Sequence, residues 1–226
     1  MGLTTNFASP LRYPGGKSRI SSFIEDILLL NNLEDCTFYE LYAGGAGVSL
    51  NLLFSNIVSK IVLNDLDIHI FNFWESILYE TESFLKLLND TRIDISNWDK
   101  QRYVYTNPKE FTPIQIGFSA FFLNRCNRSG ILYKAGPIGG REQTGNYKID
   151  VRFNKRELSK RINKIAKYQE KISIKNQESI SFLRKVFNNK NEKRFVFLDP
   201  PYYNQGGNLY FNFYNDNDHQ NLCSLL

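Results

Sequence analysis

The sequence predicts an α/β fold built on a parallel sheet, because strand and helix patterns alternate through its first third. Residues 37–41 form a short β-rich run, and a glycine-rich loop and a helical pattern over 48–54 follow it. A second strand is expected over 60–63, ending at Asn64-Asp65, and helical spacing resumes over 67–78. Strand, glycine loop, helix, strand and acid, in this order, are the βαβ layout of nucleotide-binding α/β proteins.

The length and composition suit one such domain with a small insertion. The chain has 226 residues, enough to bury a core. It contains no run of 18 apolar residues and no signal-peptide pattern, so we expect a cytoplasmic protein that does not cross a membrane. Cys36, Cys126 and Cys223 are odd in number and widely spaced, which predicts neither disulfides nor a metal motif.

Charge is distributed unevenly along the chain. Residues 1–99 carry 6 Lys/Arg and 13 Asp/Glu, whereas residues 100–194 carry 22 and 7, a net charge of +15. Residues 195–226 carry none and 3, and the whole chain has a net charge of +5. A basic middle section flanked by acidic ends indicates a surface for a polyanion, most simply nucleic acid, although a basic face without a ligand is the alternative.

The glycine loop Tyr42-Ala43-Gly44-Gly45-Ala46-Gly47 and the acid Asp65 are the first candidate ligand-binding group. Glycines permit a sharp turn and close approach of the backbone to a ligand. A carboxylate at the end of the second strand can accept hydrogen bonds from both ribose hydroxyls. The loop lacks the Gly-Lys-Ser/Thr ending of a phosphate-binding loop, which argues against a nucleotide triphosphatase.

The middle section is predicted to be mainly helical, with one basic loop. Thr112, Pro113 and Gln115 form a helix start, and the helix should run to about residue 125. Residues 134–153 are expected to be an irregular loop. Asn154 with Glu157 predicts a second helix. The residues expected on its inward face are Leu158, Ile162, Ile165 and Ile172.

Asp199-Pro200-Pro201-Tyr202 follows the apolar run 195–198 and is the second candidate group. Its residues suit methylation of the exocyclic amine of a nucleobase, a poor nucleophile because its lone pair is delocalised into the ring. The carboxylate and a backbone carbonyl beside proline can accept both N–H groups, and the prolines hold the carbonyls rigidly. The tyrosine ring can stack on a base that has left the duplex. Taken alone, the tetrapeptide can equally be a strand end followed by a Pro-Pro turn.

These groups, taken together, resemble the Dam-type (D12 class) DNA adenine-N6 methyltransferases over about residues 9–220. Three segments resemble the family's opening, cofactor and catalytic motifs: Arg12-Tyr13-Pro14-Gly15-Gly16-Lys17, Glu40-Leu41 with the glycine loop, and Asp199-Pro200-Pro201-Tyr202. Two others resemble landmarks of its target-recognition insertion, Leu123 to Gly130 and Arg152-Phe153-Asn154. The resemblance implies a Rossmann-like S-adenosylmethionine-dependent methyltransferase sheet with a mainly helical target-recognition insertion. It also implies an adenine flipped out of double-stranded DNA.

The resemblance assigns roles to individual residues. The cofactor-binding residues that it implies are Tyr13, Lys17, Tyr42, Gly44, Gly45, Gly47, Asp65, Glu178 and Asp199. The catalytic residues are Asp199, Pro200, Pro201 and Tyr202. The candidates for DNA contact in the basic section are Arg125, Arg128, Arg141, Lys148 and Arg152. His69 and His219 have no partners at metal-ligand spacing, so we expect packing or surface roles for them and no metal.

The domain boundaries follow from the same reading. We expect the cofactor-binding part of the core over 1–99, the basic insertion over 100–190, and the catalytic strand with the start of a helix over 191–226. The family continues beyond the catalytic motif, so the C-terminal strands of the sheet are expected to be missing here. An RNA adenine methyltransferase and a truncated, non-catalytic DNA-binding relic are the alternatives. A cognate restriction endonuclease is a conceivable partner.

Overall fold

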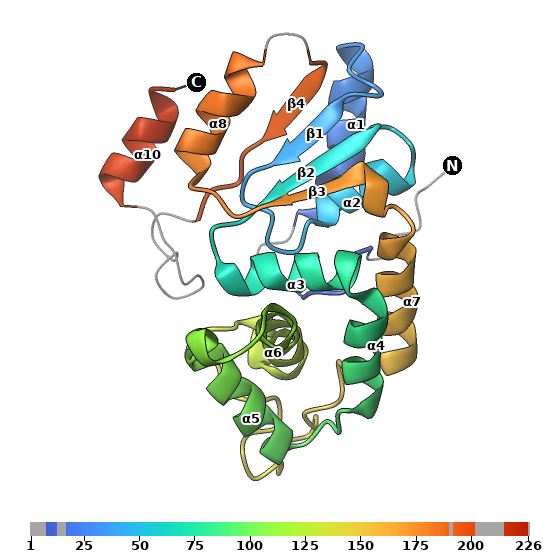
Figure 1. Ribbon diagram of the computed structural model, residues 1–226, viewed down its shortest axis with the longest axis vertical. Coiled ribbons are helices and arrows are strands. Elements are labelled where there is room, and N and C mark those ends of the chain that lie inside the picture. The colour runs from blue at the N-terminus through green and yellow to red at the C-terminus, as the bar shows by residue number, and fades with distance from the viewer. Residues whose placement is uncertain (1–7, 13–16, 190–191, 202–214, 226) are drawn as a thin grey trace.

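The computed structural model describes residues 8–12, 17–189, 192–201 and 215–225, and these residues form a layered α/β fold. A parallel sheet carries helices on both faces, and a group of helices extends from its β3 side (Figure 1). The elements are η1 (Ser18–Ile20), α1 (Ser21–Leu30), β1 (Thr37–Glu40), α2 (Gly47–Phe54), β2 (Lys60–Asn64), α3 (Ile68–Tyr79), α4 (Thr81–Asp90), α5 (Ile95–Thr106), η2 (Pro108–Glu110), α6 (Pro113–Cys126), η3 (Arg128–Gly130), α7 (Lys155–Ala166), η4 (Gln169–Lys171), β3 (Ile172–Lys175), α8 (Ser179–Asn188), β4 (Arg194–Phe197) and α10 (Asp216–Cys223).

The described strands lie in the order β3-β2-β1-β4, and every pair is parallel. Phe38 of β1 lies opposite Ile61 of β2 and Phe195 of β4, and Ile61 lies opposite Ile172 of β3. The predicted strand–loop–helix–strand order is confirmed, with α2 and β2 ending within one residue of the expected positions. Because all four strands run the same way, their carboxyl ends meet at one edge.

Alternate residues of the central strands face opposite layers, as the two-residue period of a strand requires. Tyr39 and Val62 pack with Leu183 of α8 in a cluster that also includes a residue of α10. Phe38 and Ile61 belong to the larger core, to which α1 and α2 contribute. Figure 1 shows α8 and α10 on one side of the sheet and α1 and α2 on the other. The strands are thus buried between two layers, as is usual for parallel sheets.

The chain between β2 and β3 builds the helical region, in which α3 packs on α6, α5 on α6, and α4 on α7. Helix α6 begins at the predicted Pro113, and Thr112 and Gln115 form the predicted capping box. Aromatic rings fill the space between α3, α4 and α6, and Phe73 stacks on Phe121 with ring centroids 5.8 Å apart, a usual distance for such pairs. Residues 134–153 contain no helix or strand, as expected.

The second predicted helix is shorter than expected, and the assignment of Ile172 to it was wrong. Helix α7 buries Leu158, Ile162 and Ile165 but ends at Ala166, and Ile172 begins the edge strand β3. The physical reason is a turn at η4 followed by the β-branched alternation Ile172-Ser173-Ile174, which suits a strand paired with β2. The range 100–190, expected to be insertion, therefore contains one strand of the sheet.

Close packing of α3 against α6 depends on Gly117. A Cβ atom at this position would lie 2.5 Å from the main-chain oxygen of Asn72, so a side chain here forces the two helices apart. At Gly136, by contrast, the nearest atom to such a Cβ is 3.5 Å away, at the tip of the Arg128 side chain.

We predict that Gly117→Ala lowers the free energy of unfolding by about 1–3 kcal/mol, the usual cost of overpacking, despite the better helix propensity of alanine. Gly136→Ala is the matched control and should change it by less than about 0.5 kcal/mol. Urea denaturation of both variants checks this. Equal stability of Gly117→Ala and the wild type would contradict the packing described for α3 and α6.

None of the helices in the described ranges has the length and apolar character that crossing a bilayer requires.

Candidate active site

Acidic residues from three neighbouring strands gather at the carboxyl edge of the sheet. Glu40 is the last residue of β1, Asp65 follows β2, and Asp199 lies two residues beyond β4. The three are close enough that Asp65 and Asp199 both help to raise the pKa of Glu40. This edge is where open α/β sheets bind their ligands, and it contains both groups that the sequence singled out.

The glycine loop makes a tight turn between β1 and α2. Gly44 has φ 44° and Ala46 has φ 48°, so two of its residues lie in the left-handed region. The loop is fixed to the rest of the protein by its main chain: Ala43 N donates to Asn64 O at 2.9 Å, and Gly44 O accepts from Trp74 Nε1 at 3.0 Å. Of the other predicted loop residues, Gly45 is partly buried and Gly47 begins α2 against Ser18.

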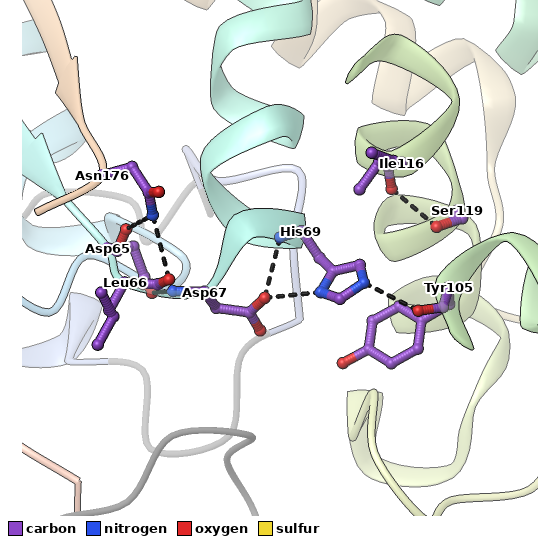
Figure 2. A network of polar contacts seen from close by, with 8 residues as sticks. All are labelled: Asp65, Leu66, Asp67, His69, Tyr105, Ile116, Ser119 and Asn176. Atoms are coloured by element: carbon purple, nitrogen blue, oxygen red, sulfur yellow. Dashed lines mark hydrogen bonds and ion pairs between the residues drawn. The ribbon is translucent and has the colours of Figure 1, made fainter. Parts of the chain in front are cut away.

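Asp65 is joined directly to this loop. Its Oδ2 accepts from Gly44 N at 2.8 Å, and its Oδ1 accepts from Asp67 N at 3.0 Å. The main-chain oxygens of Asp65 and Leu66 accept from Asn176 Nδ2 at 2.7 and 3.1 Å (Figure 2). The loop after β2 is therefore held by the glycine loop after β1 and by the segment after β3. Burial, and then the nearby Asp67 carboxylate, raise the pKa of Asp65 to about 7.

Glu40 is a buried acid that sequence reasoning quoted within a motif without giving it a role. Its side chain is 6 % exposed and accepts hydrogen bonds from the main-chain N–H and the hydroxyl of Ser49, near the start of α2. Burial raises its pKa to about 7, against the opposing effect of the Ser49 hydrogen bonds. Glu40 therefore ties the end of β1 to α2, beneath the glycine loop.

Lys17 and Asp199 form an ion pair, although they are 182 positions apart in the chain. Lys17 Nζ donates to Asp199 Oδ2 at 2.5 Å, and both side chains are 30 % exposed. The structure thus brings the N-terminal lysine to the catalytic motif. The resemblance implies that Lys17 binds the cofactor, a role that the pair with Asp199 leaves untested. Pro200 and Pro201, which follow Asp199, are partly buried.

Two asparagines that sequence reasoning missed hold the carboxyl edge together. Asn64 is completely buried, and its Nδ2 donates to the main-chain oxygens of Leu41 and Gln177, at 3.2 and 3.0 Å. Its Oδ1 accepts from Gln177 N at 3.0 Å, so one side chain links the segments after β1, β2 and β3. Asn176, described above, is the second. The available signal was an asparagine at the carboxyl end of each strand, Asn64 as the last residue of β2 and Asn176 directly after β3.

The remaining residues predicted to bind the cofactor have different surroundings. Tyr42 is partly buried and packs against the cluster of Tyr39 and Leu41. Glu178 is exposed, and its carboxylate caps α8 by accepting from Ile180 N and Ser181 N at 2.8 and 2.7 Å. Tyr13 and Tyr202 lie outside the described residues.

The landmark 123–130 holds the first residue of the N-terminal motif, Arg12, by its main chain. Asn124 is fully buried; its Oδ1 accepts from Arg12 N at 2.6 Å, and its Nδ2 donates to Arg12 O at 3.1 Å and Gly130 O at 2.9 Å. Gly130 has φ 74°, and a Cβ there would lie 2.1 Å from Arg12 O. Asn127 is also buried and accepts from Trp98 Nε1 at 2.7 Å.

Of the five residues predicted to contact DNA, one is turned towards the protein and four are exposed. Arg125 faces the protein: its guanidinium donates to the main-chain oxygens of Arg152 and Pro10, and burial lowers its pKa to about 10. Arg141 is exposed but forms a bidentate pair with Asp99, with both contacts at 2.9 Å. The exposed side chains of the others are those of Arg128, Lys148 and Arg152.

Within the described part of the chain, no group of three or more His, Cys, Asp or Glu side chains is arranged to hold a metal ion.

A parallel sheet with a glycine loop after one strand and an acid after the next defines a nucleotide-binding class of α/β protein. Comparison with protein families identifies the family itself: residues 13–225 match the D12 class N6 adenine-specific DNA methyltransferases. Because the match covers most of the chain, the chain belongs to this family. No curated protein matches it.

Membership of a methyltransferase family implies S-adenosylmethionine as the cofactor, and the chemistry of the edge fits this molecule. Asp65 offers carboxylate oxygens beside a backbone turn, which suits ribose hydroxyls. The partly exposed charges of Lys17 and Asp199 suit the charged amino-acid end or the reacting base. Asp65 would hold the cofactor most directly.

We predict that Glu40→Gln gains stability relative to the wild type as the pH rises from 6 to 8. The folded-state pKa of about 7 lies above the unfolded value, so the wild type loses stability as Glu40 ionises through about pH 7. Glutamine keeps an acceptor for Ser49 and does not ionise. The difference in free energy of unfolding between the variant and the wild type should change by about 1 kcal/mol between pH 6 and pH 8.

Urea denaturation of both proteins at pH 6 and pH 8 measures this shift. Asp65 is present in both proteins, so the part of its titration that does not depend on the charge of Glu40 cancels in the comparison. A stability difference that is the same at both pH values would contradict a buried, proton-binding Glu40.

Proposed function

We propose that this protein transfers a methyl group from S-adenosylmethionine to the N6 amine of adenine in a short sequence of double-stranded DNA. Family membership supports the reaction class. The observation that carries the proposal for this chain is the ion pair of Lys17 with Asp199, at the same edge of the sheet as Asp65 and the glycine loop. It brings the N-terminal, cofactor and catalytic motifs to one edge of the sheet.

The cofactor side of the site is assigned to the glycine loop and Asp65. The cofactor supplies an electrophilic methyl group on a sulfonium that is already a good leaving group. Asp65, fixed by Gly44 N and Asp67 N, accepts hydrogen bonds from the ribose. Since burial raises the pKa of Asp65 to about 7, its carboxyl group is fully ionised only above neutral pH.

The amine side of the site is assigned to Asp199 and the prolines after it. An Asp199 carboxylate can accept an N–H of the adenine amine, and a main-chain carbonyl beside Pro200 can accept the other. Both contacts draw the nitrogen towards tetrahedral geometry and restore its lone pair. Lys17 donates to Oδ2 of Asp199, which holds the carboxylate in place and balances its charge. Holding the amine and methyl group in line contributes ~7–11 kcal/mol by proximity.

The DNA side is assigned to the basic section between residues 100 and 194. Arg128, Lys148 and Arg152 have exposed side chains and are the best candidates for phosphate contacts. Arg141 can reach DNA only by leaving or sharing its pair with Asp99. Arg125 acts indirectly, because its guanidinium holds Arg152 O and Pro10 O. Flipping the adenine costs a few kcal/mol, which stacking and edge contacts offset.

Transfer of tritium from labelled S-adenosylmethionine to unmethylated duplex DNA tests the proposal. We predict N6-methyladenine in DNA digests of the wild-type reaction. Asp199→Asn should lower the rate by roughly 10²-fold or more, because the neutral amide oxygen of asparagine is a weaker acceptor for the amine N–H than a charged carboxylate. Asp90→Asn, at an exposed residue of α4, is the matched control and should react at the wild-type rate.

Three outcomes would overturn the proposal. Label on RNA or protein but not on DNA would assign a different substrate. Cofactor binding without any label would favour a non-catalytic, DNA-binding protein. Full activity of Asp199→Asn would remove Asp199 from the chemistry.

A further inference from the structure

The His69 side chain connects the loop that contains Asp65 to helix α5. His69 Nδ1 lies 2.8 Å from Asp67 Oδ1, and Nε2 lies 2.9 Å from the main-chain oxygen of Tyr105. The imidazole is buried, with 5 % of the side chain exposed, and its ring stacks on that of Tyr105 with centroids 4.0 Å apart. Figure 2 shows the imidazole between the Asp67 carboxylate and the end of α5.

Both of these neighbours are hydrogen-bond acceptors. A carbonyl oxygen has no proton to donate, and neither does an ionised Asp carboxylate, so both act only as acceptors. A neutral imidazole has one N–H and one lone pair, so one of the two contacts would set a lone pair against an acceptor. An imidazolium donates from both nitrogens and satisfies both contacts.

The charges around the ring favour the imidazolium. Asp67 lies on one side, and it also caps α3 by accepting from His69 N at 2.9 Å. Tyr105 is in the last turn of α5, where carbonyls lack partners within the helix and the helix dipole is negative. A cation, Arg102, lies on the other side of the balance, with its guanidinium carbon 5.7 Å from the centroid of the Tyr105 ring.

We propose that His69 is a positioning residue of the cofactor site, an imidazolium that donates to both Asp67 and the carbonyl of Tyr105. It sets the position of Asp67, whose main-chain N–H in turn orients the carboxylate of Asp65. The proposal rests on the proposed function only in taking Asp65 as a cofactor ligand. It also makes α5, a helix between β2 and β3, part of the support of the cofactor site.

The protonation state is tested by ¹⁵N NMR of protein labelled at histidine. The chain has 2 histidines, and His219→Gln removes the other signal and so assigns His69. We predict that both ring nitrogens of His69 are protonated at pH 7 in the protein without cofactor. An unprotonated ring nitrogen at that pH would overturn the imidazolium, including the case in which Asp67 holds the proton instead.

The positioning role is tested by the dissociation constant of S-adenosylmethionine, measured by calorimetry. His69→Phe keeps the ring and removes both donors, and should weaken binding about tenfold, equivalent to about 1.4 kcal/mol. His69→Asn keeps a donor near the position of Nδ1 and should weaken binding less. Tyr103→Phe is the matched control: it changes an exposed side chain of the same helix, whose hydroxyl donates to Glu110, and should bind normally.

Thermal melting of each variant separates positioning from folding. Unchanged dissociation constants in both His69 variants, with or without a lower melting temperature, would overturn the positioning role, because a purely structural residue changes stability alone. If His69→Phe does not fold, His69→Asn decides the question. If the wild type does not bind the cofactor, the proposed function and the positioning role both fail, and the NMR result still decides the charge state of His69.

Discussion

The parallel direction of the strands is the constraint on which the site depends. Because β1, β2 and β4 end at the same edge, the residues that follow them converge, and three of these are acids: Glu40, Asp65 and Asp199. Such a concentration of carboxylates raises the energy of the ionised forms. Lys17 pairs with Asp199 and offsets part of this charge. Burial first, and neighbouring carboxylates in addition, raise the pKa values of Glu40 and Asp65 to about 7. The edge is therefore sensitive to protons and to bound ligands.

The helical region between β2 and β3 contributes to the site through polar contacts. Asn124 of α6 holds the main chain of Arg12, in the N-terminal motif that also contains Lys17. The carbonyl of Tyr105 in α5 contacts His69 beside the Asp65 loop. Both contacts come from helices that the charge distribution associates with nucleic acid. The helical region is thus tied by polar contacts to the edge of the sheet where we propose that the cofactor binds.

The order of the central elements could be predicted because local signals are strong: the β-rich runs, the glycine loop and the capping box at Thr112 each specify one structure. Ile172 could not be assigned correctly, since an apolar residue seven positions after Ile165 fits a helix until its strand partner is known. The pair of Lys17 with Asp199 and the inward role of Arg125 depend on contacts across 182 and 27 positions. No local pattern encodes these contacts. Family resemblance pointed to the residues, but not to their partners.

We assign cofactor binding to Asp65 and binding of the reacting amine to Asp199. The most direct test is to measure, by calorimetry at pH 8, the binding of S-adenosylmethionine to the variants Asp65→Asn and Asp199→Asn. We predict that Asp65→Asn weakens binding about tenfold or more, because it loses charge-assisted hydrogen bonds to the ribose. Asp199→Asn should bind within about threefold of the wild type, since its carboxylate is assigned to the amine. The reverse pattern, with normal binding by Asp65→Asn and none by Asp199→Asn, would contradict this assignment of the carboxyl edge.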